Sequence, residues 1–441
     1  MAADAPDPGP VRVALLGCGN VGGALAEMLI SERAAIAART GVELELVGIA
    51  VSDLGRPRPP VVPTELLTDD AASLVTGPGV DVVVELMGGI DPARELVEAA
   101  LRAGRPVVTG NKALLAETGA GLAALAEAHG VDLLYEAAVG GAIPVVRALR
   151  QSLAGERVRR VTGIVNGTTN YILTRMGEEG IDYAEALAEA QRLGLAEGDP
   201  TADVEGYDAA AKAAILAGLA FGSEVSLADV WREGISGVRA ADVAFADRLG
   251  YVVKLLAVAE QVGGGPEISV RVHPGMVPRS HPLASVRGAF NAVFVEGDAC
   301  GELMLYGRGA GGRPSASAVL GDLVDASRNL RAGVATPAPR RRATPVHPMA
   351  ELRSTFYLSL DVADEPGVLA AVAAVFGDHK VSIRVMEQVG LGQEARLIFL
   401  THTALEGDVQ ETLADLHRLG AVDRVGGVLR VIVPEDGVDG P

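Results

Sequence analysis

The chain has 441 residues, of which 49% are apolar and 3% aromatic, and its formal net charge is −19. A chain of this length is expected to form about three domains. The acidic charge argues against a nucleic-acid partner, because proteins that bind nucleic acids meet the phosphates with positive charge. Cys18 and Cys300 lie far apart and show no partner pattern, which argues against a disulfide framework or a Cys-rich metal site.

The sequence shows neither a targeting segment nor a membrane segment. Its N-terminus, Met1 to Pro10, is polar and Pro-rich, whereas a signal peptide is basic and then apolar. No apolar run approaches the ~20 residues that cross a bilayer. These features predict a soluble, cytoplasmic protein without a membrane partner.

Short apolar runs alternate with helical segments over residues 11–135. This alternation is typical of βαβ units and predicts an α/β domain with a Rossmann-type, doubly wound parallel sheet. Ligands of such sheets bind beyond the carboxyl ends of the strands. The expected strands are VRVALLG, VELELVGIAV, VDVVVEL, RPVVTG and VDLLYE, and the expected helices cover residues 24–38, 92–103 and 113–129.

The pattern changes at Glu136, and residues 136–309 predict a second, α+β domain with helices over 183–193 and 207–221. A helix over 315–330 follows, and we expect residues 310–332 to complete the first domain. Residues 333–350 are rich in Pro, Arg and Ala and predict a linker, whose basic run at 340–342 is a solvated segment rather than a binding patch. Residues 351–434 show the order βαββαβ, a ferredoxin-like module.

A glycine-rich turn follows the first expected strand directly. Gly17 permits a tight turn, Gly19 lets the backbone approach a pyrophosphate, and Gly22 lets the helix pack on the strand. The helix that begins there offers its N–H groups to phosphates. A turn without a ligand is the alternative, but the position at the first βα junction favours dinucleotide binding.

The end of the second strand bears on the choice of dinucleotide. No acidic residue stands at its tip to take a ribose 2′-hydroxyl, and Asp53 follows only two residues after Val51. Arg56 is available for a 2′-phosphate. The sequence favours NADP and leaves NAD as an alternative.

Two lysines are candidates for the chemistry. Lys112 lies where a strand end meets the next helix, at the edge of the cofactor crevice. A cation is unfavourable beside a helix N-terminus, so we expect Lys112 to have an anionic partner nearby. The alternative is an ordinary lysine at the start of a helix. Lys212 is the only charge between Asp208 and Glu224 on an apolar helix, so we expect it to be buried. Asp208 precedes it by one turn. The alternative is an ion pair on the helix surface.

A buried lysine beside an aspartate suits the interconversion of a carbonyl and an alcohol. Hydride transfer to a carbonyl leaves negative charge on oxygen, which an ammonium group stabilises and protonates. Asp208 would orient the ammonium, and Glu197 would bind an amino group of the substrate. Asp203 and Glu205 are interpreted as caps or solvated loop charges.

The sequence resembles the homoserine dehydrogenases over residues 11–330. The most specific blocks are GIVNGTTNYIL and AEGDPTADVEGYDAAAKAAIL, and every motif residue is present. The resemblance implies interconversion of L-aspartate 4-semialdehyde and L-homoserine with NAD(P), in the biosynthesis of threonine, methionine and isoleucine. It implies that Lys212 is the proton donor, that Asp208 and Glu197 contact substrate, and that Lys112 lies between substrate and cofactor.

The resemblance also implies further ligand contacts. Five residues would line the cofactor, namely Asn20, Val21, Thr109, Gly194 and Gly309. A monovalent cation, usually sodium, would be held by the Glu136 side chain and by the backbone carbonyls of Val139, Gly141 and Ile143; hard oxygen ligands fit such an ion. The 136–309 domain would bind substrate and form the contacts of a homodimer or homotetramer.

The C-terminal module resembles an ACT domain, with Asp364-Glu-Pro-Gly-Val-Leu369 at its first strand–helix turn. Such domains bind amino acids, and the resemblance implies feedback by L-threonine. The alternative is a domain that serves oligomerisation or has lost its ligand.

Two other functions remain to be distinguished. A semialdehyde dehydrogenase would form a thioester on a cysteine, but no histidine is evidently paired with either cysteine. A regulatory protein that senses nucleotides without catalysis would not need the set of Glu197, Asp208 and Lys212.

Overall fold

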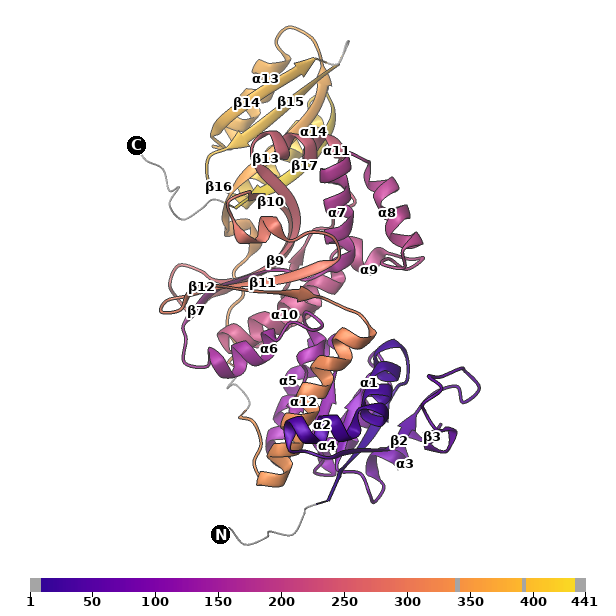
Figure 1. Ribbon diagram of the computed structural model, residues 1–441. Coiled ribbons are helices and arrows are strands. Elements are labelled where there is room, and N and C mark those ends of the chain that lie inside the picture. Colours follow the sequence, from indigo (N-terminus) through magenta and orange to yellow (C-terminus); the bar gives the residue numbers. More distant parts are fainter. Residues whose placement is uncertain (1–8, 338–341, 391–393, 433–441) are drawn as a thin grey trace. The chain divides into compact units, whose positions relative to one another are not determined.

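The computed structural model describes residues 9–337, 342–390 and 394–432 (Figure 1). Unit 1 comprises Met1–Gly155, Gly218–Leu227 and Gly307–Arg342, and unit 2 comprises Glu156–Ala217, Ala228–Tyr306 and Ala343–Pro441. Parts of the N-terminal segment, of the basic run at 340–342 and of the C-terminal module fall on residues 1–8, 340–341 and 433–434, outside the described residues. Within the described ranges, no helix combines the length and the apolar character that a membrane crossing requires.

Unit 1 is built on a parallel sheet. Counted over the described residues, it has six strands in the order β3-β2-β1-β4-β5-β6. The chain begins in the middle of the sheet, runs to one edge and returns to fill the other, which confirms the predicted doubly wound fold. The strands are β1 (Val11–Leu16), β2 (Leu44–Ala50), β3 (Leu67–Thr68), β4 (Val82–Glu85), β5 (Val107–Thr109) and β6 (Leu133–Leu134).

Helices connect and cover these strands. Helix α12 comes from much later in the chain and packs against α1, with Val319 and Leu323 buried in the same core as Leu25. The helices of unit 1 are α1 (Asn20–Ser31), α2 (Arg33–Thr40), α3 (Ala71–Thr76), α4 (Ala93–Arg102), α5 (Lys112–His129), α6 (Val145–Arg147), a π-helical turn (Ala148–Ser152) and α12 (Gly312–Ala332).

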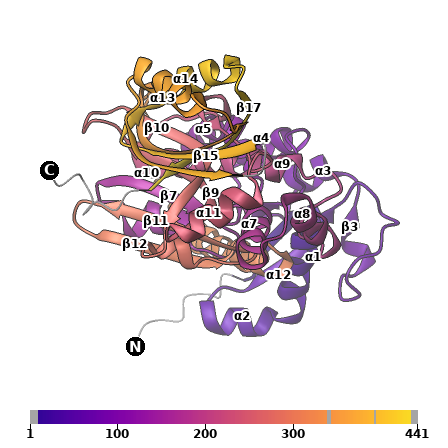
Figure 2. The ribbon, with the colours of Figure 1, turned by 90° about the horizontal axis from the view of Figure 1, so that it is seen from above.

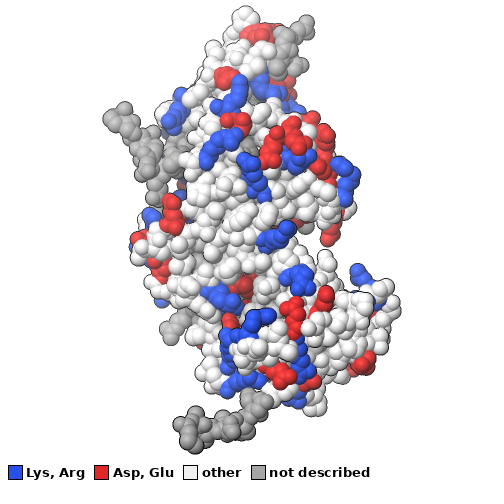
Figure 3. All heavy atoms as spheres, viewed as in Figure 1, with Lys and Arg blue, Asp and Glu red and all other residues white. Residues whose placement is uncertain are grey.

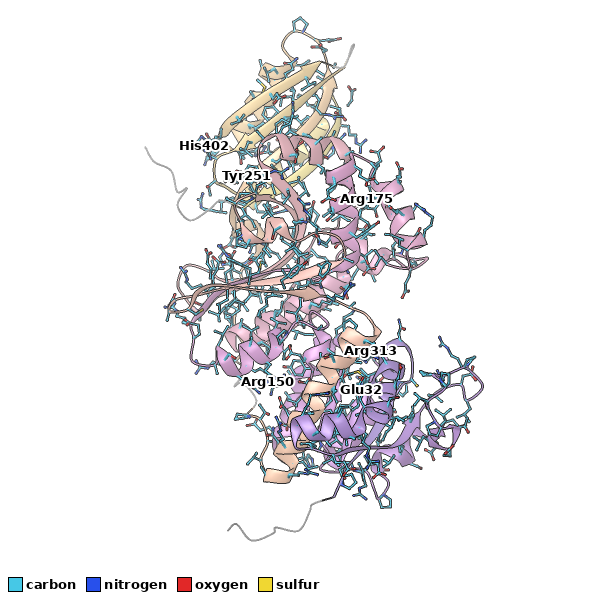
Figure 4. All side chains as sticks on the ribbon, viewed as in Figure 1. Glu32, Arg150, Arg175, Tyr251, Arg313 and His402 are labelled. Carbon is cyan, nitrogen blue, oxygen red and sulfur yellow. The ribbon has the colours of Figure 1, made fainter. Side chains whose placement is uncertain are left out.

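The single helix predicted over 24–38 is wrong, because the chain breaks between α1 and α2. Glu32 adopts a non-helical backbone, with φ −111° and ψ 12°. The break redirects the chain so that Ile36, 1% exposed, enters the core of unit 1. The Glu32 carboxylate lies 3.2 Å from the guanidinium of Arg313 on α12, and both side chains are labelled in Figure 4.

Unit 2 contains one long mixed sheet. Over the described residues it has eleven strands, of which nine follow the order β12-β11-β7-β9-β10-β17-β13-β15-β14. The other two, β8 (Trp231–Arg232) and β16 (Ala404–Leu405), pair with β10 and β13. Strands β10 and β17 pair in parallel over two residue pairs, Gly275 with Arg430 and Met276 with Val431. The other strands are β7 (Val158–Ile164), β9 (Tyr251–Gln261), β10 (Ile268–Pro278), β11 (Phe290–Gly297), β12 (Gly301–Arg308), β13 (Arg353–Ala363), β14 (Ile383–Gly390), β15 (Glu394–Thr401) and β17 (Val422–Val431).

The C-terminal part of unit 2 confirms the predicted βαββαβ module. Its elements follow the order β13-α13-β14-β15-α14-β17 along the chain, and its strands lie in the order β17-β13-β15-β14. Figure 2 shows α13 and α14 on the same side of these strands. The helices of unit 2 are α7 (Gly167–Glu179), α8 (Tyr183–Arg192), α9 (Thr201–Val204), α10 (Tyr207–Phe221), α11 (Ala240–Arg248), α13 (Val368–Asp378) and α14 (Glu406–Arg418). The residues of α10 from Gly218 onward are assigned to unit 1.

Acidic and basic side chains are interspersed on the face drawn in Figure 3. Several form ion pairs between elements, such as Arg175 of α7 with Glu189 of α8 at 2.8 Å. This pair is only partly buried, and ion pairs that remain in contact with water contribute little to stability. Charges that are buried therefore carry more information about function.

Candidate active site

The lysine that the sequence singled out lies inside unit 2. Helix α10 carries Lys212 and Asp208 on one face, and their residues are only 7% and 8% exposed. The Lys212 ammonium lies 2.7 Å from the Asp208 carboxylate and donates to the backbone carbonyl of Val165 at 2.6 Å. The predicted burial and the predicted pairing of these two residues are both present.

The apolar character of α10 explains why this pair forms. Alanine and leucine fill the faces of the helix, so a charge there leaves water and must find a partner. Removing one partner of a buried pair typically costs about 3–5 kcal/mol, since the other charge stays buried. The pair thus holds the ammonium at a fixed position.

Asn166 joins this pair to a second aspartate. Its side-chain oxygen caps α7 by accepting from the N–H of Thr169 at 2.9 Å. Its side-chain nitrogen donates to Asp208 at 2.9 Å and to Asp203 at 2.7 Å. Asp203 therefore belongs to a hydrogen-bond network with Asp208. The sequence had predicted only a helix cap or a solvated charge at this position.

Glu197 lies in an exposed loop that is tied to the same region. The hydroxyl of Thr168, two residues after Asn166, donates to the carbonyl of Leu195 at 2.6 Å. The amide of Gln191 donates to the Glu197 carbonyl at 3.0 Å. The residue itself is exposed, so its carboxylate is accessible to a ligand; Gly194, with φ 70°, is exposed in the same loop.

The glycine-rich turn of unit 1 has the geometry of a phosphate-binding loop. Gly17 has φ 92°, and a Cβ there would lie 2.6 Å from the carbonyl oxygen of Leu86. A Cβ on Gly22 would lie 2.1 Å from the carbonyl oxygen of Gly17. At Gly19 a Cβ would meet nothing within 4 Å, so the space over this residue is open. Helix α1 begins at the next residue, Asn20, and its first turn offers N–H groups.

A buried carboxylate that the sequence did not single out supports the neighbouring loops. Glu85, at the end of β4, is fully buried and accepts from the hydroxyl of Thr109 at 2.6 Å and from the N–H of Met87 at 2.8 Å. Asn111 caps α5 by accepting from the N–H of Leu114 at 3.1 Å. Lys112, half-buried, is then the first residue of α5.

The loop that follows β2 carries Arg58, which contacts the glycine-rich turn. Its guanidinium donates to the carbonyl of Cys18 at 3.0 Å and to that of Asp53 at 2.9 Å. Arg56, the residue that the sequence suggested, is exposed. The side chain of Asp53 accepts from the N–H of Gly55 at 2.8 Å, which stabilises the turn between them.

The residues predicted to hold a cation lie in one short segment of unit 1. The Glu136 carboxylate is buried and accepts from the N–H groups of Val146 at 2.9 Å and Arg147 at 2.8 Å. Burial raises the pKa of Glu136. A Cβ on Gly141 would lie 2.5 Å from the carbonyl oxygen of Gly309, so the cation segment and this predicted cofactor residue are in contact. The predicted oxygen donors Val139, Gly141 and Ile143 follow in the same segment.

Neither cysteine is set up as a nucleophile. Burial raises the pKa of the Cys18 thiol, which lies inside the glycine-rich turn. Desolvation and the nearby Glu156 carboxylate raise the pKa of Cys300. Because the thiolate is the reactive form, both environments disfavour a thioester mechanism.

Comparisons with known proteins cover almost the whole chain. Three family models match, described as homoserine dehydrogenase (residues 144–324), homoserine dehydrogenase NAD-binding domain (residues 17–136) and ACT domain (residues 356–421). The homoserine dehydrogenase of Corynebacterium glutamicum is 51% identical over 433 residues, covering 97% of this chain and 97% of that protein.

Two solved structures extend the comparison. A homoserine dehydrogenase from Thiobacillus denitrificans is similar with a TM-score of 0.88 at 40% identity, covering 96% of this chain and 98% of that chain. A hyperthermophilic archaeal homoserine dehydrogenase in complex with NADPH is similar with a TM-score of 0.59 at 29% identity, covering 73% of this chain and 98% of that chain.

Proposed function

Because the chain belongs to the homoserine dehydrogenase family, we propose that Lys212 delivers the proton in the interconversion of L-aspartate 4-semialdehyde and L-homoserine. In the reducing direction NADPH supplies a hydride to the aldehyde carbon, and the carbonyl oxygen takes a proton, so one NADPH and one proton are consumed. The buried ammonium of Lys212, held by Asp208 and the Val165 carbonyl, carries this proposal.

The neighbouring acidic residues have separate proposed roles. Asp208 positions the ammonium and contacts substrate, and Asn166 positions Asp208. Glu197 binds the amino group of the substrate, which its exposed carboxylate suits. Lys112, at the start of α5, is the second candidate for proton transfer.

A direct assay tests this function. Pure, folded protein should oxidise NADPH when L-aspartate 4-semialdehyde is added, and should reduce NADP with L-homoserine. A protein that binds NADPH but turns over neither substrate would instead be a nucleotide-sensing regulator, and the catalytic proposal would fail.

NADP is the proposed preferred cofactor, bound along Gly17, Gly19, Asn20, Val21 and Gly22. Thr109, Lys112, Gly194 and Gly309 are the other proposed contacts. The guanidinium of Arg58, held over the turn by two carbonyls, favours a 2′-phosphate. Arg58→Ala should lower kcat/KM for NADPH about tenfold or more and leave that for NADH nearly unchanged. Arg56→Ala is the matched control, and an equal loss in both variants would contradict the assignment to Arg58.

A sodium ion is proposed at Glu136 and the carbonyls of Val139, Gly141 and Ile143. Burial disfavours the ionised form of the Glu136 carboxylate, and a cation bound beside it would stabilise that form. Oxygen ligands of this kind suit sodium, which supports the proposal. When bound, the ion would hold this segment in shape. Replacing sodium by a large organic cation should lower thermal stability as well as activity, and no change in either would exclude the site.

L-threonine is the proposed feedback effector, acting through the ACT domain, and the enzyme would supply homoserine for threonine, methionine and isoleucine biosynthesis. Asp364, in the first strand–helix turn, is the proposed point of contact. Threonine should lower activity in the wild-type chain, and Asp364→Ala should weaken this response. Light scattering would test the proposed homodimer or homotetramer.

A further inference from the structure

Glu85 and Asp132 are buried carboxylates at opposite ends of the strands in the parallel sheet of unit 1. Glu85 is the last residue of β4, at the end where the ligands of such sheets bind, and is fully buried. Asp132 directly precedes β6, at the other end, and is 2% exposed. Among the described residues, neither carboxylate forms an ion pair with a basic side chain. Hydrogen bonds therefore compensate these two charges, because an isolated charge is costly to bury.

The hydrogen bonds of Glu85 are those of an ionised carboxylate. Its Oε1 accepts from the N–H of Met87 at 2.8 Å, and its Oε2 accepts from the hydroxyl of Thr109 at 2.6 Å. The side-chain amide of Asn111 also donates to Oε1, at 3.4 Å. A protonated carboxyl group would need an acceptor, whereas each of these partners donates a hydrogen. Glu85 therefore places a full negative charge at the end of β4.

This charge lies between two parts of the proposed cofactor site. Thr109, its hydrogen-bond donor on β5, is one of the proposed cofactor contacts. The residues that follow Glu85 pass close to the glycine-rich turn, because a Cβ on Gly17 would lie 2.6 Å from the carbonyl oxygen of Leu86. Strand β4 pairs with β1 on one side and with β5 on the other. Glu85 therefore lies at the carboxyl ends of the strands that carry both contacts.

The strand order assigns this region to one end of the dinucleotide. A doubly wound sheet consists of two halves that each take one nucleotide, and the adenosine ribose lies at the tip of the second strand. The half that begins with β4 is then left for the nicotinamide nucleotide. An oxidised nicotinamide ring is positively charged and a reduced ring is neutral, so a buried carboxylate in this half distinguishes the two forms.

We propose that Glu85 stabilises the bound oxidised dinucleotide relative to the reduced one, and so favours hydride transfer from NADPH to the aldehyde. NADPH gives up a hydride with both electrons of its C–H bond, and its ring is left with one positive charge. The carboxylate attracts that charge, and the low dielectric of a buried site strengthens the attraction. Glu85 acts through its charge rather than by contact with substrate. This role rests on the NADP site proposed for unit 1.

A purely structural role for Glu85 makes a different prediction. Its hydrogen bonds to Met87 and Asn111 hold the loop after β4 and the start of α5 in place. Loss of such an anchor would weaken the binding of both oxidation states equally. The ratio of the Kd for NADP⁺ to the Kd for NADPH therefore separates the charge from the anchor.

The test measures both dissociation constants on the full chain. The fluorescence of NADPH gives its Kd, and competition with NADPH gives the Kd for NADP⁺. In Glu85→Gln the Kd for NADP⁺ should rise about tenfold relative to the Kd for NADPH, because the amide has a similar shape and no charge. Glu85→Asp keeps the charge on a shorter side chain, so its ratio should stay within about threefold of the wild type.

Asp132→Asn is the matched control. It neutralises a buried carboxylate of the same unit that also accepts from neutral donors, the side chain of Asn329 at 2.8 Å and the N–H of Thr336 at 2.6 Å. Because Asp132 lies at the amino end of its strand, this variant should leave the ratio within about twofold of the wild type.

Three outcomes would overturn the role of the charge. Both Kd values could change equally in Glu85→Gln, which would reduce Glu85 to an anchor. The ratio could shift as much in Asp132→Asn as in Glu85→Gln. If Glu85→Gln does not fold, a tenfold shift of the ratio in Glu85→Asp would contradict the proposal in the same way. A folded wild-type chain that binds neither nucleotide would instead refute the NADP site itself.

Discussion

Among the residues of unit 2 that the structure describes, two lysines are buried, and they have different partners. Lys212 of α10 has an anionic partner, Asp208, at 2.7 Å. Lys254 of β9, 3% exposed, donates to neutral oxygens, the side chain of Asn170 at 2.9 Å and the carbonyl of Val286. Both interrupt apolar segments, so an isolated cation in an apolar run is not by itself the mark of a catalytic lysine.

Asparagines of the α7 region contribute to the surroundings of both lysines. Asn166, at its start, contacts Asp208 and through it Lys212, and Asn170, one turn later, contacts Lys254 directly. The NGTTN motif thus holds one lysine through an aspartate and the other through an amide. Lys254 also lines a cavity of unit 2, of about 470 Å³. We expect the anionic partner to distinguish Lys212, the proposed proton donor, from Lys254, which we interpret as structural.

The largest expected effect is on kcat, in Lys212→Met. Loss of the proton donor should lower kcat about 10²- to 10⁴-fold, while NADPH still binds. Lys254→Met is the matched control and should keep kcat within about threefold of the wild type. Because Asp208 would be left buried without its partner, the double variant Lys212→Met/Asp208→Asn should regain stability without regaining activity. Similar losses of kcat in Lys212→Met and Lys254→Met would contradict the distinction between a proton-donating and a structural lysine.

The second effect is on stability and depends on pH. Burial lowers the pKa of Lys254 from 10.5 to about 8. Between these values the unfolded chain binds a proton that the folded chain does not, so the Lys254 contribution to stability rises as pH rises and is lost as pH falls through about 8. Over the full window this contribution is on the order of 3 kcal/mol.

The measurement is the free energy of unfolding of wild type and Lys254→Met between pH 8 and 10. The wild type should gain stability relative to the variant as pH rises. A constant difference would show that Lys254 remains protonated, and that its neutral partners hold an ammonium as well as Asp208 does.

A third, smaller effect is expected on kcat in Asn166→Ser. Serine retains the cap of α7, since both residues cap helices well. It removes the amide nitrogen that holds Asp203 and Asp208, so kcat should fall about tenfold with little change in KM for NADPH. An unchanged kcat would limit Asn166 to a capping role, and a lower melting temperature with normal kcat would show the same.

Local patterns predicted much of this architecture. The bounds of α10 match the predicted helix at 207–221, and the spacing of four residues placed Asp208 beside Lys212. The long ladder of β9 and β10 was not predicted, because continuous apolar runs do not distinguish strands from buried helices.

Contacts between distant segments left little trace in the sequence. Asn166 is 42 positions from Asp208, and the pairing of β10 with β17 involves backbone atoms alone over two residue pairs. Glu85 belonged to the expected strand VDVVVEL without being singled out, and only the fold shows that it is buried and accepts a hydrogen bond from Thr109. Such contacts depend on the tertiary fold, and one sequence does not specify them.

The smallest expected effect separates substrate binding from proton transfer. Glu197 is exposed in its loop, unlike the buried Asp208. Glu197→Gln should raise KM for L-homoserine about fivefold and leave kcat within about twofold, because an exposed contact with an ammonium contributes about 1 kcal/mol. Glu185→Gln, an exposed glutamate of α8, is the control. A fall in kcat without a change in KM would move Glu197 from binding the substrate to positioning Lys212, and the charge that activates this lysine would then not be Asp208 alone.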